Sequence, residues 1–282
     1  MGYETYRALR VHSEAGTARV TIDHPPINLL DGELMADLDT LSRQLETDDE
    51  VRVVVFDSAN PDYFVAHYDI DALLARFATT RPKAGTLSRF HLVLERLRTL
   101  PKLTIAQLEG RARGAGSELL LALDLRFASR ERAVLGQPEV ALGILPGGTG
   151  SQRLPRIVGR ARALEVILGA EDFGAELAEQ YGWVNRALPQ RELGPFVERL
   201  ARRIASFPPE AVALAKRAVD LADLPLHDGL LEEAHLFSQL TATPEARRRM
   251  RAFLAIGGQT ADGELDIQAL LGQLTPGPAS IP

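Results

Sequence analysis

The stretch from Gly110 to Leu154 constrains the fold of this 282-residue chain more than any other segment. It contains two glycine-rich turns, GRARGAG and PGGTG, separated by a short apolar helical segment and a β-like segment. Glycine permits backbone angles that other residues avoid, and it lets the backbone approach a ligand closely. The stretch therefore predicts short elements of alternating type that end in turns with accessible backbone N–H groups.

Two isolated acids stand within this stretch. Glu118 falls in the first turn of the apolar helix, and Glu139 follows Gly136-Gln137-Pro138. Apolar surroundings raise the pKa of a carboxyl group, whereas N–H groups near a helix start favour its ionised form, and both effects suit acid–base chemistry. Taken alone, the pattern fits acid–base chemistry and a non-catalytic interpretation equally well, the latter with Glu118 as only a helix-start acid and Glu139 as only a surface residue after a turn. The two glutamates by themselves do not decide the function.

The first sixty residues favour a layered α/β fold. Ala18–Ile22 alternates between apolar and polar residues like a half-buried strand, and 51–56 is the continuous apolar run of a buried strand. Between them, Asp31 is a candidate N-cap for a helix whose apolar residues keep helical spacing at Leu34, Met35, Leu38, Leu41 and Leu45. Strand, helix and strand in this order predict parallel pairing. Later in the chain, the segment from Trp183 to Arg186 is expected to form a further strand.

Composition excludes several classes of function. The chain has 32 Lys and Arg against 38 Asp and Glu, so its formal charge is −6, which argues against non-specific nucleic-acid binding. It has no cysteine, and therefore no disulfide, catalytic thiol or cysteine metal site. The six histidines lack metal-ligand spacing, and no Walker A loop or Gly-x-Ser-x-Gly elbow occurs. We therefore expect no metal centre.

The chain also shows no sign of a membrane segment. Its first residues are charged and lack the apolar core of a secretory signal, and no run of about 18 apolar residues occurs anywhere. We expect a cytoplasmic protein.

Four motifs resemble the enoyl-CoA hydratase/isomerase (crotonase) family. They are RGAGSEL at 113–119, DLRFAS at 124–129, GQPE at 136–139, and PGG followed by QRL at 146–154. Their order and spacing are more specific than any single glycine motif, and the similarity covers about residues 5 to 255. The resemblance implies an α/β fold, a crotonase-like spiral of ββα repeats with a C-terminal helical trimerisation part. We accordingly expect a crotonase-like core at 1–200, a helical part at 201–256 and a flexible tail at 257–282.

The resemblance also implies a set of site residues. The family's two acids correspond to Glu118 and Glu139, and the two backbone N–H donors of its oxyanion hole correspond to those of Tyr68 and Ala115. Residues expected to line the substrate and coenzyme A are Ala66, His67, Asp69, Gly114, Pro138 and Gly147.

The function implied by the resemblance is that of an enoyl-CoA hydratase, which adds water across the 2,3 double bond of a 2-enoyl-CoA thioester. Coenzyme A enters as part of the substrate, and no other cofactor, nucleic acid or membrane is expected to take part. A homotrimer or a dimer of trimers is the expected assembly. The alternatives are an enoyl-CoA isomerase, another acyl-CoA enzyme of the family such as a decarboxylase, and a non-catalytic acyl-CoA- or RNA-binding member.

The chain departs from the family pattern at two places. His67 replaces a glycine next to the expected donor Tyr68, which either brings an imidazole to the substrate or only fills space. Near the C-terminus the family's lysine is missing, and the run from Arg247 to Arg251 is either a solvated face or a substitute phosphate contact.

Overall fold

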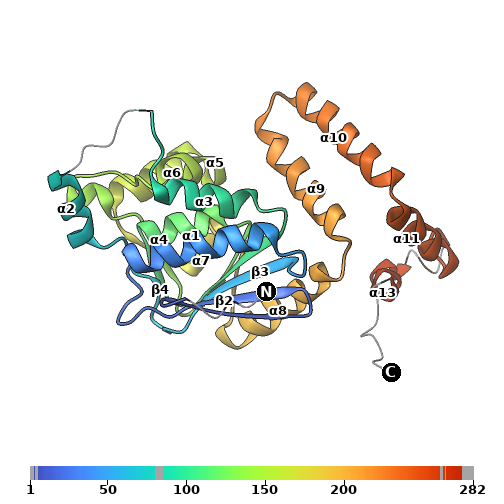
Figure 1. The fold of residues 1–282 in the computed structure, drawn as a ribbon, viewed down its shortest axis with the longest axis horizontal. Helices are drawn as coiled ribbons and strands as arrows, with labels where there is room; N and C mark the ends of the chain where they lie inside the picture. Colours follow the sequence, from blue (N-terminus) through green and yellow to red (C-terminus); the bar gives the residue numbers. More distant parts are fainter. Residues whose placement is uncertain (1–2, 4–5, 80–84, 261–262, 264, 275–282) are drawn as a thin grey trace. The chain divides into compact units, whose positions relative to one another are not determined.

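The computed structural model describes residues 3, 6–79, 85–260, 263 and 265–274, and the chain divides into two compact units, Met1–Arg202 and Arg203–Pro282 (Figure 1). The first unit contains both sheets and all of the residues expected at the site. The second unit consists of helices.

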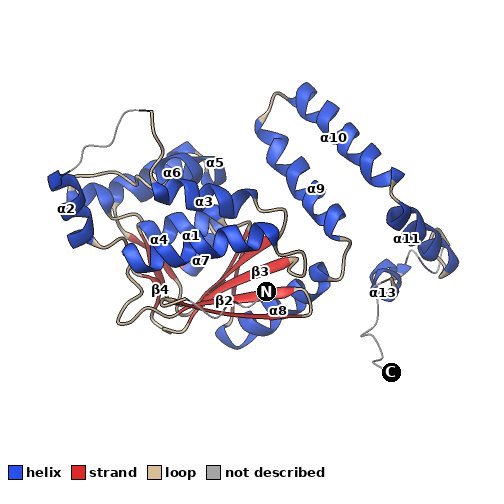
Figure 2. Cartoon of the chain, viewed as in Figure 1, coloured by secondary structure: helices blue, strands red, loops and turns tan. Residues whose placement is uncertain are grey.

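The larger sheet of the first unit has six strands, in the order β1-β2-β3-β5-β7-β10 (Figure 2). Apart from the antiparallel pair β1 and β2, neighbouring strands are parallel. The continuous apolar run at the start of β3 is buried, as expected for a strand in the interior of such a sheet. The strands are β1 (Leu9–Glu14), β2 (Thr17–Ile22), β3 (Val53–Ser58), β5 (Leu103–Leu108), β7 (Leu125–Ser129) and β10 (Arg186–Leu188).

The smaller sheet follows the larger one step by step. Its order is β4 (Tyr63–Val65), β6 (Arg111–Arg113), β8 (Val134–Gly136) and β9 (Asp172–Gly174). Each of β3, β5 and β7 in the larger sheet is followed in the chain by a strand of the smaller sheet and then by helical segments. The three repeats thus bring the ends of β4, β6 and β8 to one edge, because these strands are parallel to one another.

The helices of the first unit cover the sheets, as Figures 1 and 2 show. They are α1 (Gly32–Thr47), α2 (Ile70–Thr79), α3 (Arg89–Thr99), α4 (Ala115–Ala122), the 3₁₀ turn η1 (Glu139–Leu142), α5 (Gly150–Val158), α6 (Arg160–Gly169), α7 (Ala175–Tyr181) and most of α8 (Gln190–Ala205), which runs past the unit boundary at Arg202. The predicted start of α1 is confirmed, because the Asp31 carboxylate accepts the N–H groups of Glu33 and Leu34 at 2.9 Å each.

One predicted strand begins later than the sequence pattern suggests. The pattern favours a strand from Trp183 to Arg186, whereas β10 begins only at Arg186. The N–H groups of Trp183 and Val184, which follow α7, both donate to the carbonyl of Ala178 within that helix, at 2.8 and 3.3 Å. Because these N–H groups complete the helix end, they cannot enter a sheet ladder.

The second unit contains α9 (Pro209–Asp220), η2 (Leu221–Asp223), α10 (Leu226–Ala242), α11 (Pro244–Ala255) and α13 (Ile267–Gln273). Helices α9 and α11 bury no side chain. Helix α13 lies within 257–282, where the sequence predicts a flexible tail, and residues 275–282 of that tail lie outside the described part of the chain. Within the described residues, no helix has the length and apolar character needed to cross a bilayer.

Candidate active site

The parallel strands of the smaller sheet align the predicted site residues. Val65 of β4 lies opposite Ala112 of β6, and Ala112 lies opposite Leu135 of β8. Tyr68 and Ala115 each stand three residues beyond these paired positions, so the chain leaves both strands at the same edge. The segment that follows β8 at this edge leads into η1, which begins at the second predicted acid.

The N–H of Tyr68 is directed away from the neighbouring segment of the chain. Leu30 pairs with this segment by donating its N–H to the His67 carbonyl at 2.9 Å and accepting from the Asp69 N–H at 3.1 Å. Backbone groups alternate in direction along an extended chain, so the N–H and C=O of Tyr68 face the opposite side, toward β6. Among the described residues, the Tyr68 N–H donates to no backbone carbonyl and the Tyr68 carbonyl accepts from no backbone N–H.

The N–H of Ala115 is also available at this edge. Ala115 is the first residue of α4, and the first N–H groups of a helix have no partner inside the helix. Gly114 precedes it with φ 50° and ψ −121°, a backbone conformation that side chains disfavour. The glycine therefore turns the chain so that β6 leads directly into α4, whose eight residues are all buried.

Glu118 is held by the turn that precedes α5. Its Oε1 accepts hydrogen bonds from the N–H groups of Gly148 and Gly150 at 2.7 and 2.8 Å. Only 3% of the residue is exposed. Burial raises the pKa of the Glu118 carboxyl above its ordinary value, and the two N–H donors act in the opposite direction. Since both donors bind Oε1, Oε2 is left to contact another group.

Glu139 is the second acid of the candidate site, and it is buried, with 9% of the residue exposed. Burial raises its pKa to about 7, opposed by its own backbone N–H and assisted by the negative charge of nearby Glu118. Gln137 orients the carboxylate: with its amide nitrogen toward Glu139, it donates to the two carboxylate oxygens at 3.2 and 3.0 Å and accepts from Ser117 Oγ at 3.2 Å. The amide orientation is assigned from this network of partners.

Gly114 brings Glu139 and His67 together. A β-carbon added to Gly114 would lie 2.7 Å from Glu139 Oε1 and 3.7 Å from the His67 β-carbon. These two side chains therefore stand at the same point of the backbone, immediately before the Ala115 N–H. His67 does not have a positive φ, so the imidazole is accommodated at the family's glycine position without left-handed backbone.

The remaining predicted residues have local roles in the structure. The Ala66 N–H donates to the Ile27 carbonyl at 3.3 Å, and the Asp69 carboxylate accepts the Asp71 N–H at 2.9 Å at the start of α2. Pro138 precedes η1 as its N-cap residue. Gly147 is exposed, and its N–H makes no hydrogen bond to either glutamate among the described residues.

The sequence pattern alone did not identify several residues of this site. Gln137 lies within the GQPE motif, and Gly148 and Gly150 lie within the second glycine-rich turn, so their motifs marked the region without assigning their partners. Between these glycines, Thr149 has φ 117°, and its buried hydroxyl lacks a partner among the described residues. Phe90 of α3 packs beside Gly148, a contact that no local pattern signals.

Gly148 provides a direct test of this packing. A β-carbon there would lie 2.3 Å from the Phe90 ring and 2.4 Å from Glu118 Oε2. We expect Gly148→Ala to displace the Glu118 carboxylate and to destabilise the protein by about 1–3 kcal/mol, as overpacking of a filled interior does. Thermal unfolding measures the loss. Gly169→Ala is the matched control, because its β-carbon would meet nothing within 4 Å; equal losses in both variants would contradict the prediction.

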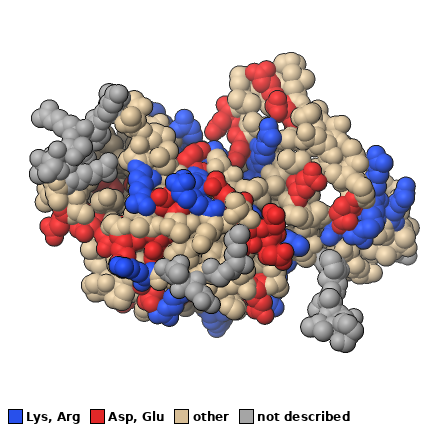
Figure 3. All heavy atoms as spheres, viewed as in Figure 1, with Lys and Arg blue, Asp and Glu red and all other residues tan. Residues whose placement is uncertain are grey.

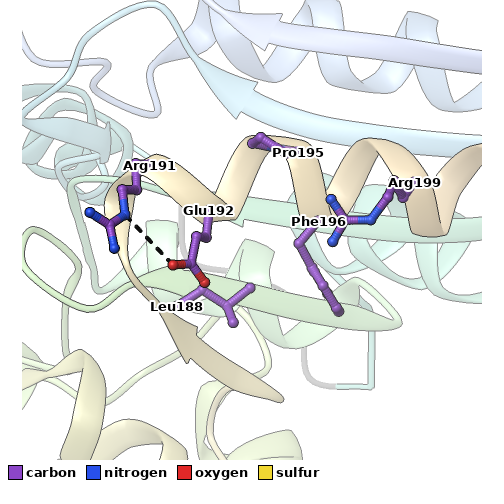
Figure 4. Close-up of a pocket in the computed structure, with 6 residues that line it drawn as sticks. All are labelled: Leu188, Arg191, Glu192, Pro195, Phe196 and Arg199. Carbon is purple, nitrogen blue, oxygen red and sulfur yellow. Dashed lines mark ion pairs between the residues drawn. The ribbon is translucent and has the colours of Figure 1, made fainter.

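Other features of the first unit do not belong to this site. Figure 4 shows a surface pocket formed by the end of β10 and by α8. None of its lining residues is a predicted site residue; they are Leu188, Arg191, Glu192, Pro195, Phe196 and Arg199. Among the described residues, no three His, Asp or Glu side chains are grouped in a way that could hold a metal ion.

Comparison with known proteins identifies the family of this chain. Residues 12–257 match the family model described as enoyl-CoA hydratase/isomerase. The short-chain-enoyl-CoA hydratase of Clostridium acetobutylicum is 34% identical over 246 residues, which cover 86% of this chain and 93% of that protein.

Solved structures show the same fold. The crystal structure of an enoyl-CoA hydratase from Geobacillus kaustophilus is 31% identical, with a TM-score of 0.83 and coverage of 89% of this chain and 95% of that one. A structure from Streptomyces avermitilis is 42% identical, with a TM-score of 0.70 and coverage of 96% and 99%. The predicted α/β class and crotonase-like spiral of ββα repeats are thereby confirmed. With two buried glutamates at the shared edge of its strands, the chain belongs to the enoyl-CoA hydratase/isomerase (crotonase) family.

Proposed function

We propose that this protein is an enoyl-CoA hydratase that adds water across the 2,3 double bond of a 2-enoyl-CoA thioester. The observation that carries the proposal is the presence of two buried acids, Glu118 and Glu139, close enough for the charge of one to raise the pKa of the other. Hydration needs two proton movements, one from the attacking water and one to the α-carbon, so a pair of acids suits it better than a single acid would.

The proposed reaction begins at Glu118. Its free Oε2 removes a proton from a water molecule, whose oxygen bonds to the β-carbon while the π electrons move toward the thioester oxygen. The N–H groups of Tyr68 and Ala115 donate hydrogen bonds to that oxygen and stabilise the negative charge that develops on it. Each such donor typically contributes about 3 kcal/mol to lowering the barrier.

Glu139 completes the addition by giving its proton to the α-carbon. Burial and the Glu118 charge raise its pKa to about 7, which keeps a proton available near neutral pH. One molecule of water has then been added, Glu118 is protonated and Glu139 is ionised. Passage of one proton from Glu118 to Glu139, directly or through solvent, restores the starting state.

The thioester and coenzyme A are proposed to lie along the same edge of the smaller sheet. The proposed contacts are Ala66, His67, Asp69, Gly114, Pro138 and Gly147, with the Gly147 N–H helping to hold the water. Coenzyme A is part of the substrate, and the proposed steps use no further cofactor. Figure 3 shows basic and acidic side chains interspersed on the face in view, which supports a small-molecule substrate rather than nucleic acid.

A direct assay separates hydration from double-bond migration. The purified protein is incubated with crotonyl-CoA and, separately, with a 3-enoyl-CoA, and the products are identified by mass: hydration adds one water, whereas migration leaves the mass unchanged. Conversion of crotonyl-CoA to 3-hydroxybutyryl-CoA supports the hydratase. Migration without hydration would assign the isomerase activity instead.

We further propose that the protein self-associates through its helical second unit, as a homotrimer or a dimer of trimers. Large apolar side chains of this unit are strongly exposed in the single chain, among them Val219, Leu226, Leu231 and Phe237 at 60–79%. Sedimentation or light scattering should give a mass three or six times 30.8 kDa. Phe237→Glu should shift that mass toward the monomer, and a monomeric wild-type protein would contradict the proposal.

A further inference from the structure

His67 is the residue at which this chain departs from its family inside the candidate site. The family pattern has a glycine there, which places no side chain beside the substrate. In this chain the position carries an imidazole on a half-buried residue next to the proposed donor Tyr68. The structure indicates where the ring lies.

The ring faces the reacting side of the chain. His67 Nδ1 lies 2.8 Å from the Tyr68 carbonyl oxygen, which can only accept, so Nδ1 carries the proton and donates. The Tyr68 C=O and N–H both face away from Leu30, as the pairing of His67 and Asp69 with Leu30 requires. The imidazole is therefore held on the same side as the N–H that is proposed to donate to the thioester oxygen.

The same side is occupied by Glu139. Its Oε1 and the His67 β-carbon both lie next to the α-carbon of Gly114, at 2.7 and 3.7 Å from the place where a β-carbon would stand. The α-carbon of a bound thioester must lie between the oxygen held by Tyr68 and Ala115 and the carboxyl that protonates it. His67 is next to Tyr68 in the chain and close to Glu139 in space, so its side chain borders the space around the α-carbon.

We propose that His67 determines acyl specificity by filling the space beside the α-carbon and thereby excluding thioesters that carry a substituent on that carbon. This inference rests on the proposed function, because that function places the thioester oxygen and its α-carbon. The hydrogen bond from Nδ1 to the Tyr68 carbonyl holds the imidazole in one orientation, and a change of rotamer would break that bond. Unbranched acyl groups pass it, and a methyl group on the α-carbon collides with it.

Binding and turnover test this inference separately. Isothermal titration compares butyryl-CoA with isobutyryl-CoA, which differ in substitution at the α-carbon and undergo no hydration. Turnover compares crotonyl-CoA with 2-methylcrotonyl-CoA. We expect the wild-type protein to prefer the unbranched member of each pair by roughly 10-fold or more, the scale of discrimination over one methyl group in an apolar pocket. His67→Ala and His67→Gly should remove most of this preference.

Controls separate specificity from other roles of the residue. His12→Ala changes an exposed histidine of β1 and should leave both ratios unchanged. Because His67 has no positive φ, alanine fits its backbone, so a relaxed preference in His67→Ala is not caused by glycine flexibility. The pH profile with crotonyl-CoA should keep its shape in both His67 variants.

Two results would overturn the inference. Ratios that stay at the wild-type value in His67→Ala and His67→Gly would show that the ring does not border the α-carbon. Loss of crotonyl-CoA turnover together with one limb of the pH profile would instead make His67 a proton-transfer group. A wild-type protein that binds butyryl-CoA but hydrates nothing contradicts the proposed function, while the binding ratios still decide the role of His67.

Discussion

Replacing Glu118 by glutamine should lower kcat for crotonyl-CoA hydration by roughly 10²–10⁴-fold, the usual contribution of a positioned acid–base group. A glutamine oxygen can still accept the N–H groups of Gly148 and Gly150, so the fold of the turn should persist. What is lost is the carboxylate oxygen that takes a proton from water. Steady-state kinetics with crotonyl-CoA measure the change.

The design of this experiment separates chemistry from folding. Burial raises the pKa of Glu118, which means that the ionised form is disfavoured where it stands. Removing that charge should leave the thermal unfolding temperature unchanged or raise it. Glu50→Gln on an exposed position is the matched control and should keep full activity. Undiminished hydration by the Glu118→Gln protein would refute its assignment as the base.

Glu139→Gln should cause the second large loss, again roughly 10²–10⁴-fold in kcat, because the glutamine amide has no acidic proton to give to the α-carbon. The wild-type protein should also show a fall in kcat/KM as the pH rises through about 7, where the raised pKa of Glu139 places its ionisation. Below that pH the protonated donor predominates. The pH profile of kcat/KM measures this limb, and activity that instead increases steadily from pH 6 to 9 would argue against Glu139 as the donor.

Stability should follow the same ionisation, with a definite sign. The pKa of Glu139 is raised from 4.5 to about 7 in the folded protein, so between these values the folded chain holds a proton that the unfolded chain has released. The contribution of this group to the free energy of unfolding therefore declines as the pH rises from 4.5 to 7. Comparing wild-type and Glu139→Gln denaturation curves across this range isolates the contribution, and identical slopes would contradict it.

Local sequence patterns predicted much of the fold. The helical spacing from Leu34 to Leu45 and the cap at Asp31 placed α1, and the apolar run at 51–56 placed β3. These predictions succeeded because each depends on neighbours within one or two turns of the chain. The prediction of a strand from Trp183 was wrong because it depended on a contact beyond the local pattern. The first N–H groups of this segment donate to the carbonyl of Ala178, which apolar periodicity does not reveal.

The candidate site divides in the same way. Motif spacing singled out Glu118 and Glu139 as candidate acids, and the glycine motifs predicted the turns around them. It did not identify Gln137 as the group that orients Glu139, or Phe90 as the side chain packed against Gly148. Phe90 comes from a separate helix, and the amide of Gln137 acquires its partners only when α4 and η1 are brought together.

The sequence by itself determined the family and singled out the two candidate acids and the glycine turns, because these depend on residue type and on spacing along the chain. Only the tertiary structure decided that Glu118 is bound by two N–H groups through one oxygen, and that Glu139 and His67 meet at Gly114. The physical reason is the parallel pairing of β4, β6 and β8. This pairing places the ends of three strands next to one another, although they are separated by tens of residues in the chain. Burial at that edge then raises the pKa of each acid.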